Sequence, residues 1–223
     1  SVKDIILNCK PPKPCKYFSG RSDELENLHT LLADNDKIFI QGIAGIGKSE
    51  FVKAYADIYK KDYTNIIYLV YSWNLRNDIA YISFCDDTQE ETIEELANKH
   101  FRFLQALKND TLLIIDNFDN SANDRYVLDV MQLNCKIIFT SRENHHQITV
   151  NLTELSGDDI FIGIAKDIFK NADNYREIIL KIADCVYHHT YAFELAMRLL
   201  EKGIDSPEEL LQKLKSENIR LSA

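Results

Sequence analysis

The eight residues Gly42 to Ser49 constrain the fold of this chain more than any other part of its sequence. They read G-I-A-G-I-G-K-S, which has the spacing G-x-x-x-x-G-K-S. The apolar residues 38–40 precede them, and the helix-like residues 50–60 follow them. Between a strand and a helix, such a loop turns its backbone N–H groups into a concavity that holds a phosphate group. A glycine-rich turn that binds nothing is the alternative, but it rarely has this context. We therefore expect a strand, a phosphate-binding loop and a helix.

Each residue type in this loop has a physical role. Glycine tolerates the backbone angles that a tight curl requires. The Lys48 ammonium is expected to bridge the β- and γ-phosphates of a nucleotide, and the Ser49 hydroxyl to complete the coordination of Mg²⁺. The expected nucleotide contacts of the loop are Gly42, Gly45, Ile46, Gly47, Lys48, Ser49 and Glu50.

Short apolar runs alternate with helix-like segments up to residue 152. In addition to 38–40, strands are expected at residues 65–71, 112–115, 136–140 and 148–152. This alternation is typical of an α/β fold in which helices cover both faces of a parallel sheet. From residue 155 onward the apolar residues keep only a helical period, over four helices.

These patterns divide the chain into three parts. We predict an extended arm rich in proline and lysine at residues 1–17, a nucleotide-binding domain at residues 18–152 and a small all-α domain at residues 153–223. A proline-rich docking motif is the alternative interpretation of the arm.

Two polar residues follow buried strands of the expected sheet. Asp116 follows the run 112–115, and Arg142 follows the run 136–140 after one serine. Because ligands bind where the carboxyl ends of parallel strands meet, both should lie beside the glycine-rich loop. An acid after four apolar residues directs a carboxylate at magnesium, although a strand that ends in Asp before a turn is common. We predict Ser49 and Asp116 as magnesium ligands and Arg142 as a γ-phosphate contact; the alternative for Arg142 is a surface arginine.

The residue after Asp116 bears on hydrolysis. Hydrolysis needs a group that orients or deprotonates the attacking water, and Asn117 can orient water but cannot take its proton. Asp119 could activate the water in place of residue 117 if the turn directs its side chain toward the nucleotide, but a turn-capping Asp is the favoured interpretation. We therefore predict slow ATP hydrolysis, with Lys48, Asp116, Asn117 and Arg142 as the catalytic residues.

Composition limits the partners of the chain. A formal charge of −9 over 223 residues argues against a surface that wraps a nucleic-acid backbone. No run approaches 18 apolar residues, and five scattered cysteines without a C-x-x-C pair are typical of reduced thiols, so we expect a cytoplasmic protein.

His145 and His146 lack metal-ligand spacing and are interpreted as loop residues, and His188 and His189 as solvated rings at a helix N-terminus. Because the chain starts at Ser1, we expect a piece of a longer protein.

Taken together, these segments resemble the NB-ARC-like branch of the STAND-class P-loop NTPases (AP-ATPases). The resemblance spans nearly the whole chain and rests on Phe18-x-Gly20-Arg21-x-x-Glu24-Leu25, on the loop at 42–49, on the strand at 112–116 and on Phe139-Thr140-Ser141-Arg142. It implies a five-stranded parallel sheet of order 5-1-4-3-2 and a helical, ARC1/HD1-like domain that clamps the base. It also implies adenine contacts from Phe18, Gly20 and Arg21. In residues 188–195, Thr190 stands where the family has a base-contacting proline, which implies a differently shaped lid.

For function, the resemblance implies a signal-transduction switch. ADP holds such a switch closed, exchange for ATP opens it, and oligomerisation follows. Winged-helix, sensor-repeat and effector domains of a longer protein are the implied partners. Two other classes stay open. One is an AAA+ or origin-binding ATPase that acts on DNA, for which Arg176 and Arg198 are the candidate lid arginines. The other is a P-loop kinase, whose acceptor site we do not find in the sequence.

Overall fold

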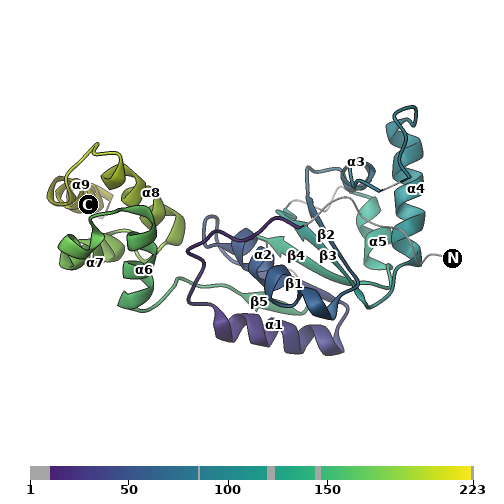
Figure 1. Cartoon of the computed structure of the whole chain (residues 1–223), viewed down its shortest axis with the longest axis horizontal. Helices are drawn as coiled ribbons and strands as arrows, with labels where there is room; N and C mark the ends of the chain where they lie inside the picture. Colours follow the sequence, from purple (N-terminus) through teal and green to yellow (C-terminus); the bar gives the residue numbers. More distant parts are fainter. Residues whose placement is uncertain (1–10, 85, 120–123, 144–146, 222–223) are drawn as a thin grey trace. The chain divides into compact units, whose positions relative to one another are not determined.

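The computed structural model of this chain describes residues 11–84, 86–119, 124–143 and 147–221, with residues 218–221 described by their backbone only. Two compact units make up the chain (Figure 1). Within the described ranges, the first unit holds residues 11–14, 23–42 and 48–151, and the second holds residues 15–22, 43–47 and 152–221. The middle of the glycine-rich loop therefore belongs to the second unit. Residues 1–10 of the expected arm lie outside the described residues.

A five-stranded parallel sheet forms the centre of the first unit. Its strands are β1 (Lys37–Gln41), β2 (Asn65–Val70), β3 (Thr111–Asp116), β4 (Lys136–Ser141) and β5 (Thr149–Asn151). They lie in the order β2-β3-β4-β1-β5, and every neighbouring pair is parallel. Read from the β5 edge, this is the expected order 5-1-4-3-2. All six residues of β3 are buried, as a strand covered on both faces requires.

Helices cover this sheet. They are α1 (Ser22–Asp34), α2 (Lys48–Ile58), α3 (Leu75–Ala80), α4 (Ile93–Ala106) and α5 (Tyr126–Met131), with a short 3₁₀ turn at Lys60–Asp62. Helices α3, α4 and α5 lie near one another beside β2 and β3 (Figure 1). Their side chains share one apolar core with strand side chains such as Phe39, Leu113 and Phe139. Side chains of a strand alternate between the two faces, so this core lies on one face of the sheet.

Four longer helices build the second unit. They are α6 (Asp158–Ile168), α7 (Arg176–Cys185), α8 (Thr190–Glu201) and α9 (Pro207–Leu221), with a 3₁₀ turn at Ala172–Tyr175. Their core includes Phe161, Ile179, Phe193 and Met197, each at most 1% exposed. Ser206 and Glu209 cap α9 reciprocally, because the backbone N–H of each donates to the side chain of the other, at 2.9 and 3.3 Å. Among the described residues, no helix is long and apolar enough to cross a membrane.

Candidate functional site

The glycine-rich loop leads directly into α2, which begins at Lys48. Gly45 and Gly47 have φ angles of 74° and 101°, in the left-handed region that favours glycine. The Lys48 ammonium donates to the Gly42 carbonyl oxygen at 2.7 Å. Burial lowers the pKa of Lys48 below its ordinary value, and charges on Asp119, Arg142 and Asp116 act on it in opposite directions. A partly desolvated ammonium of this kind is stabilised by an anion placed next to it.

The Asp116 carboxylate, at the end of β3, receives three hydrogen bonds from hydroxyl groups. One oxygen accepts from Ser49 at 3.0 Å and from Thr140 at 2.5 Å, and the other accepts from Tyr68 at 2.5 Å. Burial, and after it the hydrogen bond to Asp116, raises the pKa of the Tyr68 phenol, so the phenol stays protonated and donates. These three donors from α2, β4 and β2 hold the carboxylate in one orientation.

Ser49 and Asp116 suit a magnesium ion. Mg²⁺ usually takes one or two protein oxygens and completes its shell with water and phosphate, rather than sitting in a cage of protein ligands. The hydroxyl and the carboxylate lie within hydrogen-bond distance of each other. The described residues contain no group of three or more His, Cys, Asp or Glu side chains that could hold a metal. A hydroxyl and a carboxylate at this distance could hold an Mg²⁺ ion that takes its other ligands from elsewhere.

Asn117 is placed by an unusual backbone turn. Its φ angle is 61°, and asparagine is one of the few residues with a side chain that tolerate this region. The Asn117 N–H donates to the Thr140 hydroxyl at 2.8 Å, and the Phe118 N–H donates to the Thr140 carbonyl at 2.7 Å. The residue type at 117 therefore has a conformational reason that is independent of any role in hydrolysis.

Asp119 is an ion-pair partner of Arg142. One Asp119 oxygen accepts from the Arg142 Nε at 2.6 Å, and the other accepts from the Arg142 N–H at 2.7 Å and the Ser141 hydroxyl at 3.1 Å. Burial alone would raise the pKa of Asp119, but these hydrogen bonds outweigh it and hold the pKa below its ordinary value. The Asp119 side chain is 7% exposed and that of Arg142 is 54% exposed. The expected turn cap is thus a buried carboxylate that ties the end of β4 to the segment after β3.

Within the second unit, Arg21 holds the backbone around it. The residue is 5% exposed, and its guanidinium donates to the Thr153 carbonyl at 2.6 Å and to the Ile46 carbonyl at 3.4 Å. Gly20 has a φ of 76°, and a Cβ at this position would lie 2.5 Å from Ile160. Phe18 is half-buried and closes a turn through its N–H to Cys15. Arg21 thereby reaches the glycine-rich loop at Ile46.

His189 also contacts this loop, in contrast to the solvated ring expected from the sequence. Its Nδ1 accepts from the Ala192 N–H at 3.2 Å, which caps α8, so the ring proton lies on Nε2. Nε2 then donates to the Ala44 carbonyl at 2.7 Å, and the Tyr191 N–H donates to the Gly45 carbonyl at 3.3 Å. The expected helix N-terminus is confirmed, but the contact with the loop was not expected, because backbone carbonyl groups of a glycine-rich loop leave no mark in the sequence.

Other residues singled out in the sequence stand apart from these contacts. Thr190 opens α8, and its buried hydroxyl has no hydrogen-bond partner among the described residues. Glu50, in the first turn of α2, pairs with Lys53 at 2.7 Å. Arg176 and Arg198 pair with Asp159 and Glu194, each at 2.9 Å. His145 and His146 lie outside the described residues.

Sequence reasoning missed Tyr68, Thr140 and His189 as parts of this arrangement. For Tyr68 the sequence carries no signal, because its place is set by the strand register, in which Asp116 pairs with Val70, two residues further along β2 on the same face. For Thr140, the signal is its place near the end of the strand beside β3.

Comparison with known proteins adds a fold assignment. No protein-family model matches the chain, and no curated protein matches it. Among solved structures, it is similar to the Walker-type ATPase PABY2304 of Pyrococcus abyssi, with 13% identity and a TM-score of 0.66 over 97% of this chain and 79% of that one. The chain has the fold of a P-loop NTPase.

Two further structures share this fold. A mutant of Thermotoga maritima RuvB is 14% identical, with a TM-score of 0.57 over 94% of this chain and 74% of that one. PCH-2 of C. elegans is 14% identical, with a TM-score of 0.60 over 91% of this chain and 70% of that one. At these identities the likeness assigns the fold but not the substrate.

Proposed function

We propose that this chain binds adenine nucleotide with Mg²⁺ and hydrolyses ATP slowly. The observation that carries the proposal is the hydrogen bond of 3.0 Å from the Ser49 hydroxyl to the Asp116 carboxylate. Ser49 is the residue directly after the loop lysine. A carboxylate held by three hydroxyl donors at the end of a parallel strand matches the place where this fold binds ligands. The fold of the Walker-type ATPase supports the same assignment.

In this proposal phosphate binding, magnesium binding and water orientation fall to different side chains. The loop N–H groups and Lys48 bind the β- and γ-phosphates, and the Lys48 ammonium moves from Gly42 to the phosphates. Ser49 and Asp116 hold Mg²⁺, which supplies charge neutralisation on the phosphate oxygens when it is bound. Asn117 orients water without accepting its proton, so turnover is slow.

Adenine recognition is assigned to other residues in this proposal. Phe18, Gly20 and Arg21 are proposed at the base. The Thr190 hydroxyl is buried and unpaired among the described residues, and a hydrogen bond to the base would remove the cost of that unpaired group.

We further propose that nucleotide identity switches the protein, as in the NB-ARC-like STAND ATPases. ADP keeps it off and ATP turns it on, with Arg142 as the γ-phosphate contact. A near-complete switch requires ATP to favour the on state by roughly 5 kcal/mol. Homo-oligomerisation on activation, the additional domains of a longer protein and a cytoplasmic location belong to the same proposal.

Nucleotide released from the purified protein tests this function directly. The protein is denatured and the supernatant is separated by ion-exchange chromatography, with Lys48→Ala as the matched control. Near-stoichiometric ADP from the wild type and none from the variant would support a closed, product-bound switch. Failure of added MgADP and MgATP to bind the wild type would overturn the nucleotide assignment.

A second candidate is a motor-type ATPase that acts on DNA. The likeness to RuvB, described as a Holliday junction branch migration motor, favours it. The formal charge of −9 opposes it. Stimulation of ATP turnover by DNA separates the two candidates, because a nucleotide-gated switch gains nothing from added DNA.

A further inference from the structure

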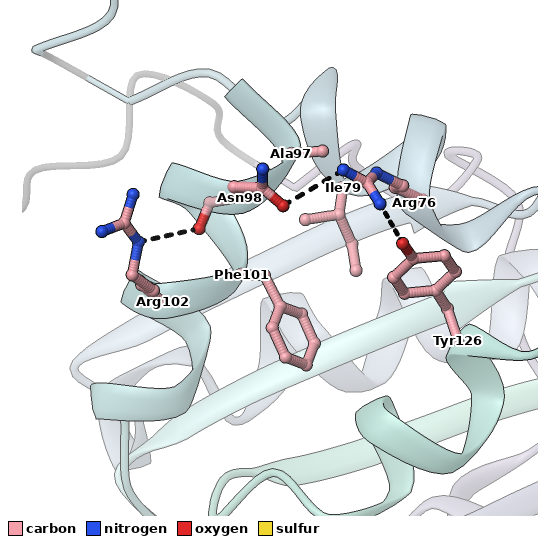
Figure 2. Close-up of a pocket in the computed structure, with 7 residues that line it drawn as sticks. All are labelled: Arg76, Ile79, Ala97, Asn98, Phe101, Arg102 and Tyr126. Atoms are coloured by element: carbon pink, nitrogen blue, oxygen red, sulfur yellow. Dashed lines mark hydrogen bonds between the residues drawn. The ribbon is translucent and has the colours of Figure 1, made fainter. Parts of the chain in front are cut away.

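A pocket of about 400 Å³ lies among α3, α4 and α5 in the first unit (Figure 2). Its lining residues are Arg76, Ile79, Ala97, Asn98, Phe101, Arg102 and Tyr126. None of them belongs to the candidate nucleotide site. The volume is at the small end of the range for small-molecule sites, roughly 300–1,000 Å³.

One side of this pocket is a row of polar groups joined by hydrogen bonds. The Arg76 guanidinium donates to the Tyr126 hydroxyl through one nitrogen and to the Asn98 side-chain oxygen through another, at 3.2 Å for Asn98. Ile79 and Phe101 lie below this row (Figure 2). Ile79 and Ala97 are buried, and Phe101 is half-buried against the core. The pocket thus has a polar row beside an apolar floor.

Most of the unused hydrogen-bonding capacity of this row consists of donors. The Tyr126 hydroxyl accepts from Arg76 and so keeps its own hydrogen to donate. The Asn98 side-chain oxygen accepts from Arg76, while no described residue accepts from its amide nitrogen. Arg102 uses only Nε, toward the Asn98 carbonyl at 3.2 Å, which leaves its two terminal nitrogens without an acceptor among the described residues. A ligand that satisfies these donors must bring acceptors.

The charge of the lining is positive in an acidic protein. Both ionisable side chains with a fixed charge in the lining are arginines, and the lining contains no carboxylate. Glu94 pairs with Arg76 at 3.0 Å from outside the lining, but its side chain is 79% exposed. Solvent screens such a pair, so an incoming anion can replace Glu94 at low cost.

The walls of the pocket are held in place before any ligand arrives. Asp124 accepts from the Leu75 N–H at 2.7 Å and from the Tyr126 N–H at 2.9 Å, which joins the first residues of α3 and α5. The Arg76 guanidinium also lies 5.3 Å from the centre of the Tyr126 ring. A preformed site loses less conformational entropy on binding.

We propose that this pocket binds a small carboxylic acid with an apolar body. The carboxylate oxygens accept from Arg76, Asn98 and Tyr126, and the apolar body lies on Phe101 and Ile79. A guanidinium is a strong donor to carboxylates, and the Arg76 nitrogen that donates to Glu94 at 3.0 Å would donate to the ligand carboxylate instead. The site is separate from the nucleotide site and does not depend on the function proposed for it.

Fluorine NMR of 3-(4-fluorophenyl)propionate with the 223-residue protein tests the proposal. The matched control ligand is 3-(4-fluorophenyl)propanamide, which has the same body and no charge. We expect the acid to bind about tenfold or more tighter than the amide, since only the acid adds the attraction between a carboxylate charge and the two arginine charges. Equal affinities for acid and amide would overturn the proposal, as would no binding of either.

Two variants with opposite expected effects locate the site. Arg76→Gln removes the charge and should weaken the acid about tenfold, whereas Glu94→Gln releases Arg76 from its screened partner and should tighten binding by up to about fivefold. Glu94→Gln leaves every wall contact of Arg76 intact, so its result does not depend on the stability of the Arg76 variant. Unchanged affinity in Glu94→Gln and in Arg76→Gln would refute the location.

Two further binding measurements test whether the acid binds at another site and whether the pocket prefers another ligand. Lys48→Ala should bind the acid as well as the wild type does, and loss of binding would place the acid in the glycine-rich loop. A peptide that ends in a C-terminal phenylalanine carboxylate should bind more weakly than the free acid. Tighter binding of the peptide would mean that the pocket binds the C-terminus of a protein rather than a small molecule, and would overturn the proposal.

Discussion

Replacement of Asp119 by asparagine separates the structural role of its carboxylate from its effect on Arg142. Asparagine keeps the shape and one acceptor oxygen, but it loses the charge and the second acceptor. In the wild type the carboxylate accepts from the Arg142 Nε, the Arg142 N–H and the Ser141 hydroxyl. The variant can satisfy two of these donors at best, because its amide nitrogen faces the third.

The expected loss of stability follows from this count. A hydrogen bond to a charged group contributes about 1.5–3 kcal/mol, and one of the three is lost outright. The Arg142 side chain is 54% exposed, so its charge returns to solvent at little further cost. We expect a loss of about 2 kcal/mol at pH 7, which for a domain of this size lowers Tm by about 4–8 °C. Glu90→Gln, which removes an exposed carboxylate, is the control and should change Tm little.

The pH dependence of this loss has a definite sign. The pKa of Asp119 is lower in the folded protein than its ordinary value. Its contribution is therefore complete above the unfolded pKa, about 3.9, and is lost as the pH falls through the folded pKa. Urea unfolding at pH 7, 5 and 3.5 should show the full difference between wild type and Asp119→Asn at the two higher values and a smaller one at 3.5. A difference that is absent at pH 7, or that grows toward acid, would refute the reasoning.

The same variant has an expected effect on nucleotide preference. If Arg142 contacts the γ-phosphate, Asp119 competes with that phosphate for the guanidinium. Asp119→Asn should then tighten MgATP relative to MgADP by about threefold to tenfold, and Arg142→Gln should lower the same ratio. Calorimetric titration of both nucleotides gives the ratio. An unchanged ratio of the two affinities in both variants would mean that Arg142 does not contact the γ-phosphate.

Three further substitutions test the candidate site. Lys48→Ala should abolish tight nucleotide binding, and unchanged affinity for MgADP in calorimetry would remove the loop assignment. Asn117→Asp should raise the rate of phosphate release from ATP several-fold if water activation limits turnover, because an acid can take the proton; no change would mean that product release or opening limits the rate. Tyr68→Phe should raise the Mg²⁺ concentration needed for half-maximal nucleotide binding by about tenfold or more, since loss of a side chain that hydrogen-bonds a metal ligand commonly has that effect. A magnesium titration with an unshifted midpoint would leave Tyr68 with a purely structural role.

Much of the fold could be predicted because it rests on local signals. The buried runs of β3 and β4 are nearly continuous in apolar residues, which parallel strands require, and the helices of the second unit keep their period. Helices α3 and α5 have only six residues each, too few to display a period. The order of the strands came from the family resemblance, since no local pattern specifies which strands become neighbours.

The candidate site was predictable only at the positions where a strand end or a motif marks it. Asp116 follows a buried run, and Lys48 and Ser49 belong to a motif, so their neighbourhood was expected. The partners of these residues come from other strands: Tyr68 from β2 and Thr140 from β4. Their contacts depend on register, which the sequence does not display. The pairing of Asp119 with Arg142 likewise joins residues 23 positions apart across two loops.

The hydroxyl donors around Asp116 have a consequence for metal binding. Three donors on one carboxylate stabilise its charged form and also occupy lone pairs that a metal or its water ligands need. In the proposed site the Ser49 hydroxyl is the one donor that would become a metal ligand, so magnesium binding would exchange its hydrogen bond for coordination. Thr140 and Tyr68 keep theirs and continue to orient the carboxylate. Under this proposal the arrangement would favour a metal that arrives with the nucleotide, because phosphate oxygens and water would then replace the hydrogen bond that Ser49 would give up.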